Sequence, residues 1–299
     1  NDLFGVLYVP MREIPELQLN SYSYSSIPRC YTYMDTGALS ASGVTRLHGH
    51  PYLKLKGSGT LVAIIDSGID YLHPAFHRGM TSKILSIWDQ ELEGGMTEKI
   101  PFGREFNRGE IEQALSAENP WEVVPSMDKS GHGTGVAATA AGYSIEKEGF
   151  SGAAPEAELV VVKLKQAKRY LRDLYLLPQE ADIYQEDDIM LAIAYVLRVA
   201  AENQKPLSIC IGLGSSMGAH QGEGPLNEYI NSIAAFSQNA VSVPAGNEGT
   251  ARHHYMKTLS AANMKDTIEL RVGEKESTRG FMLEFWGDSP NFYSMMIQS

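Results

Sequence analysis

The stretch Leu61-Val62-Ala63-Ile64-Ile65-Asp66-Ser67-Gly68 decides the fold class, because it is an apolar run that ends on a carboxylate and a glycine. An apolar run without polar alternation is typical of a strand that is buried on both faces of a parallel sheet. Four later segments repeat this texture. The predicted strands are residues 60–65, 83–88, 159–164, 207–213 and 240–243.

Helical periodicity lies between these strands. It predicts helices over residues 133–141, 187–203 and 226–238, the first of them narrow enough to pack close to a neighbour. Alternating strands and helices with short connections indicate an α/β fold with a doubly wound parallel sheet. Ligands bind such sheets beyond the carboxyl ends of the strands. The predicted core residues of the two longer helices are Ile189, Ala192, Ile193, Val196, Ala200, Ile230, Ile233 and Ala234.

Composition and charge exclude several classes of function. The chain has 299 residues, 43% hydrophobic and 20% charged, as expected of a globular protein with a large core. A formal charge of −11 argues against a nucleic-acid partner, and no apolar run approaches the length of a membrane span. Cys30 and Cys210 lack metal-ligand spacing, and Cys210 lies in an apolar run, where we expect it to be buried.

Asp66 and His132 are the candidate catalytic residues. Asp66 directly follows a predicted strand, where a carboxylate can accept the Nδ1–H of an imidazole and stabilise the imidazolium. His132 stands between two glycines at the start of a predicted helix, and we expect the glycines to leave room for a substrate beside the ring. The alternatives are a turn aspartate and a structural histidine; the two features together favour catalysis.

Asn247 ends the last predicted parallel strand, in the sequence Ala245-Gly246-Asn247-Glu248-Gly249. A carboxamide at that place can donate a hydrogen bond to the oxygen that becomes negative during acyl transfer. The alternative is a turn asparagine in a left-handed conformation. Other chemistries fit poorly: no G-x-G-x-x-G follows the first strand, no Walker A sequence appears, and the adjacent His253-His254 pair lacks zinc-ligand spacing.

These motifs resemble those of the subtilisin-like serine proteases, the subtilases. Ile65-Asp66-Ser67-Gly68 resembles the family's aspartate motif, Gly131-His132-Gly133-Thr134 its histidine motif, and Asn247 its oxyanion asparagine. The segment Gly212-Leu213-Gly214 resembles the strand that binds substrate backbone, although the family usually has serine at the first position. The resemblance covers about residues 57–255. It implies a serine endopeptidase with a protein or peptide substrate and no required cofactor. Members of the family often bind calcium, so a calcium site is also implied, with no ligands assigned.

A finer resemblance is to clostridial germination-type (Csp-like) subtilases, through segments such as residues 27–31, 34–36 and 70–76. It implies a secreted or spore-associated bacterial protein with a jelly-roll domain inserted before the serine motif. We expect residues 1–28 to be either the tail of a propeptide that acts as an intramolecular inhibitor or an N-terminal extension. Residues 29–262 are the expected N-terminal part of the catalytic core, without the serine segment. Alternating segments after residue 263 predict antiparallel strands, so residues 263–299 are the expected start of the β insertion.

The serine nucleophile is not identified within this chain. Ser216 precedes Met217 as in the family's serine motif, but it comes before Asn247, and no helical pattern follows it. We therefore expect Ser216 to border the substrate-binding loop and the nucleophile to lie beyond Ser299. The alternative is an inactive subtilase that serves as a binding or signal-sensing scaffold. The presence of Asp66, His132 and Asn247 favours the protease.

Overall fold

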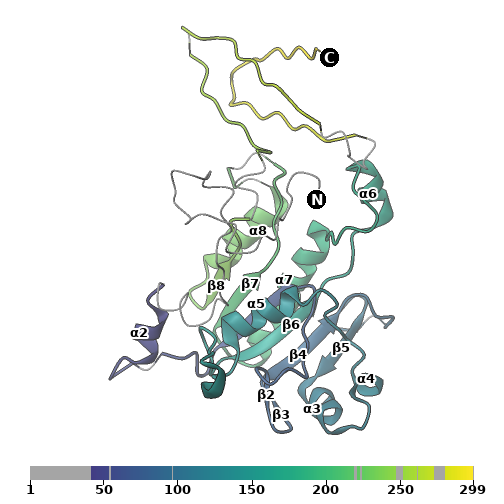
Figure 1. Cartoon of the computed structure of the whole chain (residues 1–299), viewed down its shortest axis with the longest axis vertical. Coiled ribbons are helices and arrows are strands. Elements are labelled where there is room, and N and C mark those ends of the chain that lie inside the picture. Colours follow the sequence, from purple (N-terminus) through teal and green to yellow (C-terminus); the bar gives the residue numbers. More distant parts are fainter. Residues whose placement is uncertain are drawn as a thin grey trace, which may run out of the picture. The chain divides into compact units, whose positions relative to one another are not determined.

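A six-stranded sheet forms the centre of the computed structural model, with its strands in the order β5-β4-β6-β1-β7-β8 (Figure 1). The structure describes residues 42–53, 55–95, 97–218, 221–222, 224–246, 252–260, 262–272 and 280–298. Neighbouring strands from β4 to β8 are parallel, and β5 is antiparallel to β4. The strands are β1 (Leu61–Asp66), β4 (Ile84–Asp89), β5 (Arg104–Asn107), β6 (Glu158–Lys163), β7 (Leu207–Ile211) and β8 (Asn239–Ser242), with a separate ribbon of β2 (His77–Arg78) and β3 (Thr81–Ser82).

The five predicted strands are confirmed, each displaced by no more than two residues at either end. The apolar runs predicted these strands correctly because the strands are covered on both sides, as the burial of all six residues of β1 illustrates. The antiparallel edge strand β5 was not predicted. Its four residues include one buried side chain, Phe106, and so short a segment carries no readable period.

The three predicted helices are present as α5 (His132–Ala141), α7 (Glu186–Glu202) and α8 (Pro225–Ala234). Helix α8 ends four residues before residue 238, because the chain turns there toward β8. Ala234 is exposed at this helix end, so the prediction that it is a core residue is wrong. In the described part of the chain, no helix has the length and apolar character needed to cross a bilayer. The remaining helices are α2 (Val44–His48), α3 (Arg108–Ser116), α4 (Pro120–Val123), the 3-10 turn η3 (Glu146–Glu148) and α6 (Arg169–Leu174).

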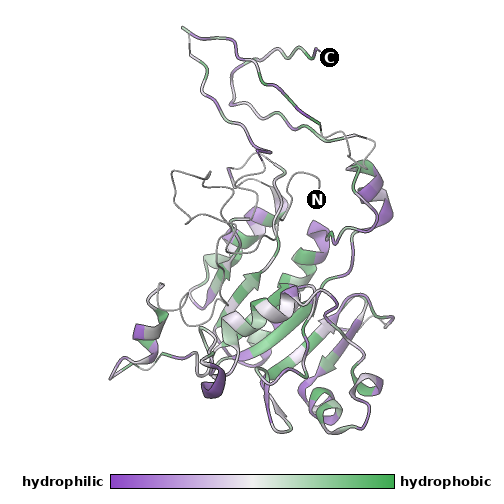
Figure 2. Cartoon of the chain, in the orientation of Figure 1, coloured by the Kyte–Doolittle hydropathy of each residue, from purple (hydrophilic) through white to green (hydrophobic). Residues whose placement is uncertain are grey.

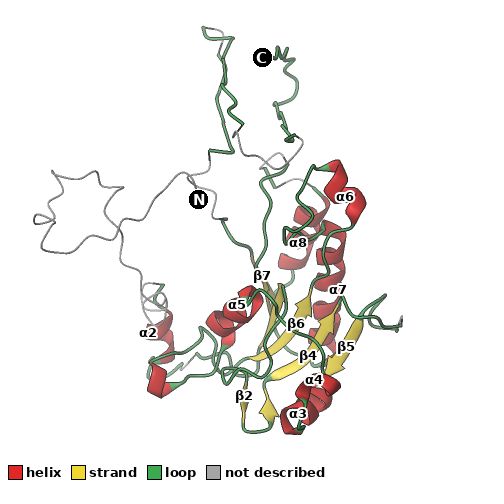
Figure 3. Cartoon of the chain, turned by 45° about the vertical axis from the view of Figure 1, so that its right-hand side comes forward, coloured by secondary structure: helices red, strands yellow, loops and turns green. Residues whose placement is uncertain are grey.

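Helices cover the sheet on both faces, with α7 and α5 on opposite sides (Figure 3). Side chains of β1 alternate between the two core clusters: Ala63 and Ile65 face α7, whereas Val62 and Ile64 face α5. Figure 2 shows the central strands, such as β6 and β7, as largely hydrophobic, whereas the edge strand β5 is mostly hydrophilic. Each fully buried aliphatic side chain stabilises the fold by about 1.5–3 kcal/mol, so the double layer fixes β1 firmly.

Strand β1 lies between β6 and β7, which places its carboxyl end in the middle of one edge of the sheet. Asp66 is in register with Lys163 of β6, and Ile65 with Ile211 of β7. Because all three strands run parallel, residues 66, 163 and 212 emerge at the same edge. This edge is where a doubly wound sheet binds its ligands.

The predicted antiparallel strands after residue 263 are not formed in the described residues 262–272 and 280–298. An isolated bridge between Ser260 and Asn263 is present nearby. The physical reason is that alternation gives a strand two distinct faces, but a ladder also requires a neighbouring backbone to pair with. The apolar side chains of these residues are exposed, for example Ile268 and Phe285. The inserted β domain therefore stays a prediction.

Candidate active site

Asp66 is the last residue of β1 and is completely buried. Its Oδ1 accepts hydrogen bonds from Nδ1 of His132 at 2.7 Å and from the backbone N–H of Ser67 at 2.7 Å. The chain then turns at Gly68, whose φ of 126° is a conformation that side-chain-bearing residues avoid. The strand end and the glycine turn therefore aim a fixed carboxylate at the histidine.

His132 begins α5, and its side chain is 55% exposed. The structure gives its two flanking glycines a backbone role, and the substrate clearance that we expected of them stays a prediction. Gly131 is the N-cap residue with φ 75°, and Gly133 packs so closely on Gly68 that an added Cβ would collide with the carbonyl oxygen there. The glycines thus allow α5 to approach the end of β1, which brings the imidazole to Asp66.

The predicted substrate-binding segment Gly212-Leu213-Gly214 follows β7 and adjoins this pair. A Cβ on Gly212 would overlap Oδ2 of Asp66 and lie 3.3 Å from Cε1 of His132. The family resemblance placed a serine at this position; in this structure only a residue without a side chain fits. Leu213 packs against the core cluster on the α7 side.

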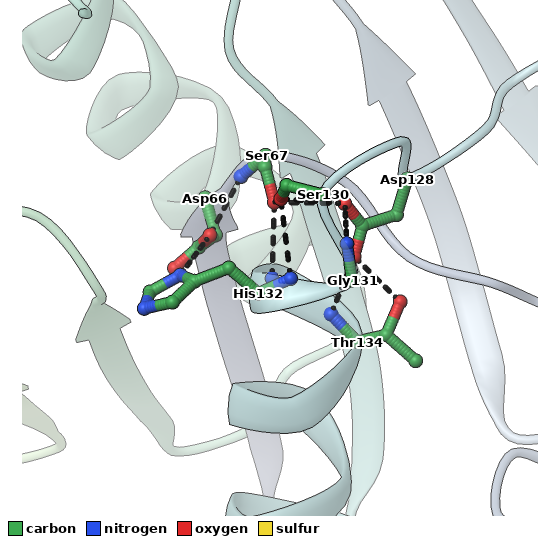
Figure 4. A network of polar contacts seen from close by, with 8 residues as sticks. Asp66, Ser67, Asp128, Ser130, Gly131, His132 and Thr134 are labelled. Atoms are coloured by element: carbon green, nitrogen blue, oxygen red, sulfur yellow. Dashed lines mark hydrogen bonds and ion pairs between the residues drawn. The ribbon is translucent and has the colours of Figure 1, made fainter. Parts of the chain in front are cut away.

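A polar network next to the pair was not predicted from the sequence (Figure 4). The carboxylate of Asp128 accepts hydrogen bonds from Ser67 Oγ at 2.9 Å and from the backbone N–H of Thr134 at 2.9 Å. Ser130 Oγ donates to Ser67 Oγ at 2.9 Å. Asp128 lies four residues before the first helical residue, outside the N-cap position at which an aspartate marks a helix start, so no local sequence signal pointed to it.

Lys163, at the end of β6, places a buried cation at the same edge of the sheet. Its Nζ lies 2.7 Å from Oε2 of Glu91 and 3.4 Å from Oδ2 of Asp89. Burial lowers the pKa of Lys163, but the hydrogen bond and charge of Glu91 and the charge of Asp89 outweigh burial and raise it. The ammonium therefore stays charged and offsets the two neighbouring carboxylates.

The other predicted site residues are Asn247 and the rejected Ser216. Asn247 lies outside the described residues, which reach Gly246 on this side of the site. Ser216 lies in the irregular segment between β7 and α8, and α8 begins only at Pro225. The helix start that would orient a nucleophile does not directly follow Ser216, and its rejection as the nucleophile stays a prediction.

Calcium is the metal that the family resemblance implies. Over the described ranges, no group of three or more His, Cys, Asp or Glu side chains is arranged to hold a metal ion. The carboxylates near the pair are already used: Asp128 accepts from hydroxyl and backbone donors, and Asp89 and Glu91 contact Lys163. These residues do not fit a calcium site.

Comparison with known proteins identifies similar sequences. A family profile for peptidase S8, described as the subtilase family, matches residues 57–268. An extracellular protease of Xanthomonas campestris pv. campestris is 32% identical over 111 residues, 37% of this chain and 18% of that protein. The subtilisin-like protease SBT1.9 of Arabidopsis thaliana is 31% identical over 126 residues, 36% of this chain and 16% of that protein.

The fold is similar to a solved structure, that of the CspB protease of Clostridium perfringens. The two chains superpose with a TM-score of 0.61 at 28% sequence identity, over 73% of this chain and 42% of the other. The present chain therefore spans less than half of that structure and less than a fifth of the two curated proteases.

Proposed function

The chain belongs to the subtilase family of serine peptidases, and from that premise we propose that its protein is an endopeptidase with an Asp66–His132–serine triad. One observation carries the proposal: Nδ1 of His132 lies 2.7 Å from the buried carboxylate of Asp66, while the ring is 55% exposed. The imidazole is thus held on one side and open on the other, as a general base requires.

In the proposed reaction, Nε2 of His132 takes the proton of a serine hydroxyl as the oxygen attacks the carbonyl carbon of the substrate. The carboxylate of Asp66 keeps Nδ1 protonated, so the lone pair is on Nε2. The same carboxylate stabilises the imidazolium that forms. His132 then returns the proton to the leaving amine. Water hydrolyses the acyl-enzyme through the same base, and the carboxyl product leaves.

We assign the remaining roles by the family's motif order. Asn247 donates its side-chain amide to the oxyanion, and the nucleophile lies beyond Ser299. Among the described residues, no serine hydroxyl forms a hydrogen bond with the ring of His132. Gly212, Leu213 and Gly214 continue a parallel strand past the sheet edge, where an extended peptide can pair with their backbone.

The assignment of domains is part of the same proposal. Residues 29–262 form the first part of the catalytic core, and residues 263–299 begin a β insertion. Residues 1–28 end a propeptide that inhibits the site until it is cleaved. The N-terminus of the purified protein, compared by mass spectrometry between wild type and a serine variant, tests the last point: an unchanged N-terminus in both would contradict autocatalytic processing.

The test of the activity is covalent labelling of the full-length protein with a fluorophosphonate, which reacts with activated serines. We expect labelling of the wild type and none of His132→Ala or of a variant in which the proposed nucleophile is alanine. Arg169→Ala serves as a control, because Arg169 is exposed in α6 and forms a surface ion pair with Asp173 at 3.5 Å. Absence of labelling in folded wild type would instead favour the inactive scaffold.

A further inference from the structure

The carboxylate of Asp128 receives hydrogen bonds from both elements that carry the catalytic pair (Figure 4). Ser67 Oγ, beside Asp66 at the end of β1, donates at 2.9 Å. From the first turn of α5, Thr134 donates through its backbone N–H at 2.9 Å and its Oγ1 at 2.6 Å, and Gly131 N–H donates at 3.0 Å. Asp128 therefore joins the residue after Asp66 to the residues on either side of His132.

The charge of Asp128 fixes the direction of every hydroxyl in this network. An ionised carboxylate only accepts, so the hydroxyls of Ser67 and Thr134 must both donate to it. Their oxygens are then free to accept, and they do so from the backbone N–H of Gly133 at 3.0 Å and of Asp70 at 2.9 Å. Two further links between the β1 turn and α5 thus depend on Asp128.

Besides the bond from its ring, His132 donates its backbone N–H to Oγ of Ser130 at 3.2 Å, and Ser130 Oγ in turn lies 3.2 Å from Oδ1 of Asp128. The ring of His132 is bonded to Asp66 and is otherwise more than half exposed, and the N-cap residue Gly131 has no side chain to cap the helix. Glycines on both sides give the backbone more freedom than any other residue would. The network supplies the missing cap from Asp128.

On these contacts we propose that Asp128 is a positioning residue of the catalytic pair, which as a carboxylate locks the start of α5 onto the end of β1 and so sets the Asp66–His132 hydrogen bond. The inference rests on the proposed protease function. Asp128 does not contact the ring of His132 in the structure, so it acts through the backbone.

The electrostatics support an ionised Asp128. Its burial raises the pKa of the carboxyl, but the hydrogen bonds from Thr134, Ser67 and Gly131 together outweigh burial and hold that pKa below the ordinary value. The carboxylate is therefore charged wherever a neutral histidine can act as a base.

Asparagine has the shape of aspartate but cannot satisfy this site. If its NH₂ group takes the place of Oδ2, it faces the N–H of Thr134; if it takes the place of Oδ1, it faces the N–H of Gly131. Either orientation sets two donors against each other, and an unmade hydrogen bond of this kind is costly. Asp128→Asn is therefore a sharp test that removes no packing volume.

The experiment uses the full-length protein and two readouts. With a fluorogenic peptide substrate, we expect Asp128→Asn to lower kcat by about 10–100-fold and to leave KM within about twofold, because small misplacements of catalytic groups cost rate and not binding. We also expect the downfield NMR resonance of the His132 Nδ1 proton to weaken or broaden. Thr134→Val should partly reproduce the loss of kcat and the weakening of the resonance. Thr134→Ser, which keeps the hydroxyl, should have the kcat and the resonance of the wild type.

The control is Asn107→Ala, which removes the capping box of α3, a helix start that carries no catalytic residue. It costs about 1 kcal/mol of stability, like the loss of other helix caps. We expect it to leave kcat and the Nδ1 resonance unchanged. The proposal is overturned if Asp128→Asn keeps the wild-type kcat and Nδ1 resonance. It is also overturned if Asn107→Ala lowers kcat and weakens the resonance as much as Asp128→Asn does. If the wild type has no activity, the proposed function fails, and the resonance alone decides the role of Asp128.

Discussion

The two oxygens of the Asp66 carboxylate have unequal surroundings. Oδ1 accepts from His132 and from the backbone of Ser67, whereas Oδ2 is buried and has no hydrogen-bond partner among the described residues. A buried charge with so few donors destabilises the fold, because desolvation is only partly offset. A buried polar group with incomplete hydrogen bonding is expected where the proposed chemistry, more than stability, requires the residue.

Asp66→Asn should separate activity from stability. We expect kcat to fall by about 10⁴-fold, as when the aspartate of other triads is replaced, because the amide no longer holds the histidine in the right tautomer. The thermal midpoint should not fall, because the variant removes a poorly compensated buried charge. Steady-state kinetics and calorimetry on the same preparation check both. A large drop in the thermal midpoint would contradict this reading of the site.

Gly212→Ala should damage the site through a steric clash. The new Cβ would overlap Oδ2 of Asp66, so we expect a loss of about 1–3 kcal/mol in the free energy of unfolding and a fall of about 10²-fold in kcat. Chemical denaturation and kinetics measure the two effects. The matched control is Gly135→Ala in α5, where the new Cβ has open space and the helix should gain about 0.5–1 kcal/mol. Equal stability of the two variants would disprove the clash.

The lowered pKa of Asp128 predicts how stability depends on pH. A carboxyl whose pKa is lower in the folded protein than its unfolded value of about 3.9 contributes stability above that value and loses it as the pH falls through the folded pKa. The wild type should therefore exceed Asp128→Asn in stability by a constant amount above about pH 5, and the difference should shrink in more acidic solution. Urea denaturation at several pH values measures it; a difference that is independent of pH would show that the charge is not responsible.

At the scale of elements, hydrophobic periodicity predicted the strands and helices that are long and buried. The apolar runs of β1 and β6 are unambiguous because both faces of each strand are covered. Helix α7 was predicted within one residue, since its apolar stripe repeats over 17 residues. Short elements such as β5 and α6 offer too few residues for a period to appear.

The candidate site was predictable where one residue carries a motif and not where several residues cooperate. Asp66 and His132 have glycine neighbours and strand-end or helix-start positions that mark them in the sequence. The hydrogen bond from the Ser67 hydroxyl to the Asp128 carboxylate spans 61 residues of sequence. The bond from the backbone N–H of Asp70 to the Thr134 hydroxyl spans 64. The choice of these partners arises from the packing of α5 on β1 and is absent from local pattern.

The segment between β6 and α7 depends on one buried guanidinium. Arg172 donates to the carbonyl oxygens of Ala167 at 3.0 Å, Pro178 at 3.1 Å and Ala181 at 2.8 Å, and to Oε1 of Gln166 at 2.7 Å. Arg172→Ala should leave these acceptors unsatisfied and open the segment locally. Hydrogen exchange should accelerate there and not in the sheet. Arg172→Lys cannot reproduce the planar fork and should restore little protection; full protection in either variant would refute this role.

At the scale of the whole molecule, the described C-terminal residues expose many apolar side chains that a folded domain would bury. Apolar side chains that alternate along this region are half exposed, including Ile268 and Leu270, each 53% exposed, and Phe285, 56% exposed. If residues 263–299 begin a β domain, the full-length protein should bury them. We expect slow hydrogen exchange at residues 266–272 and 281–285 of that protein; fast exchange throughout both would contradict the predicted insertion.

The hydrogen bonds that join Asp66 and the turn after it to His132 and the start of α5 lie between residues 66 and 134. The proposed general base, His132, is therefore oriented by contacts within residues 66–134, independently of where the proposed nucleophile comes from. This makes the protein a natural starting point for a split enzyme. A serine carried on a separate polypeptide would meet a base that is already in place, so proteolysis would begin only when the two polypeptides associate.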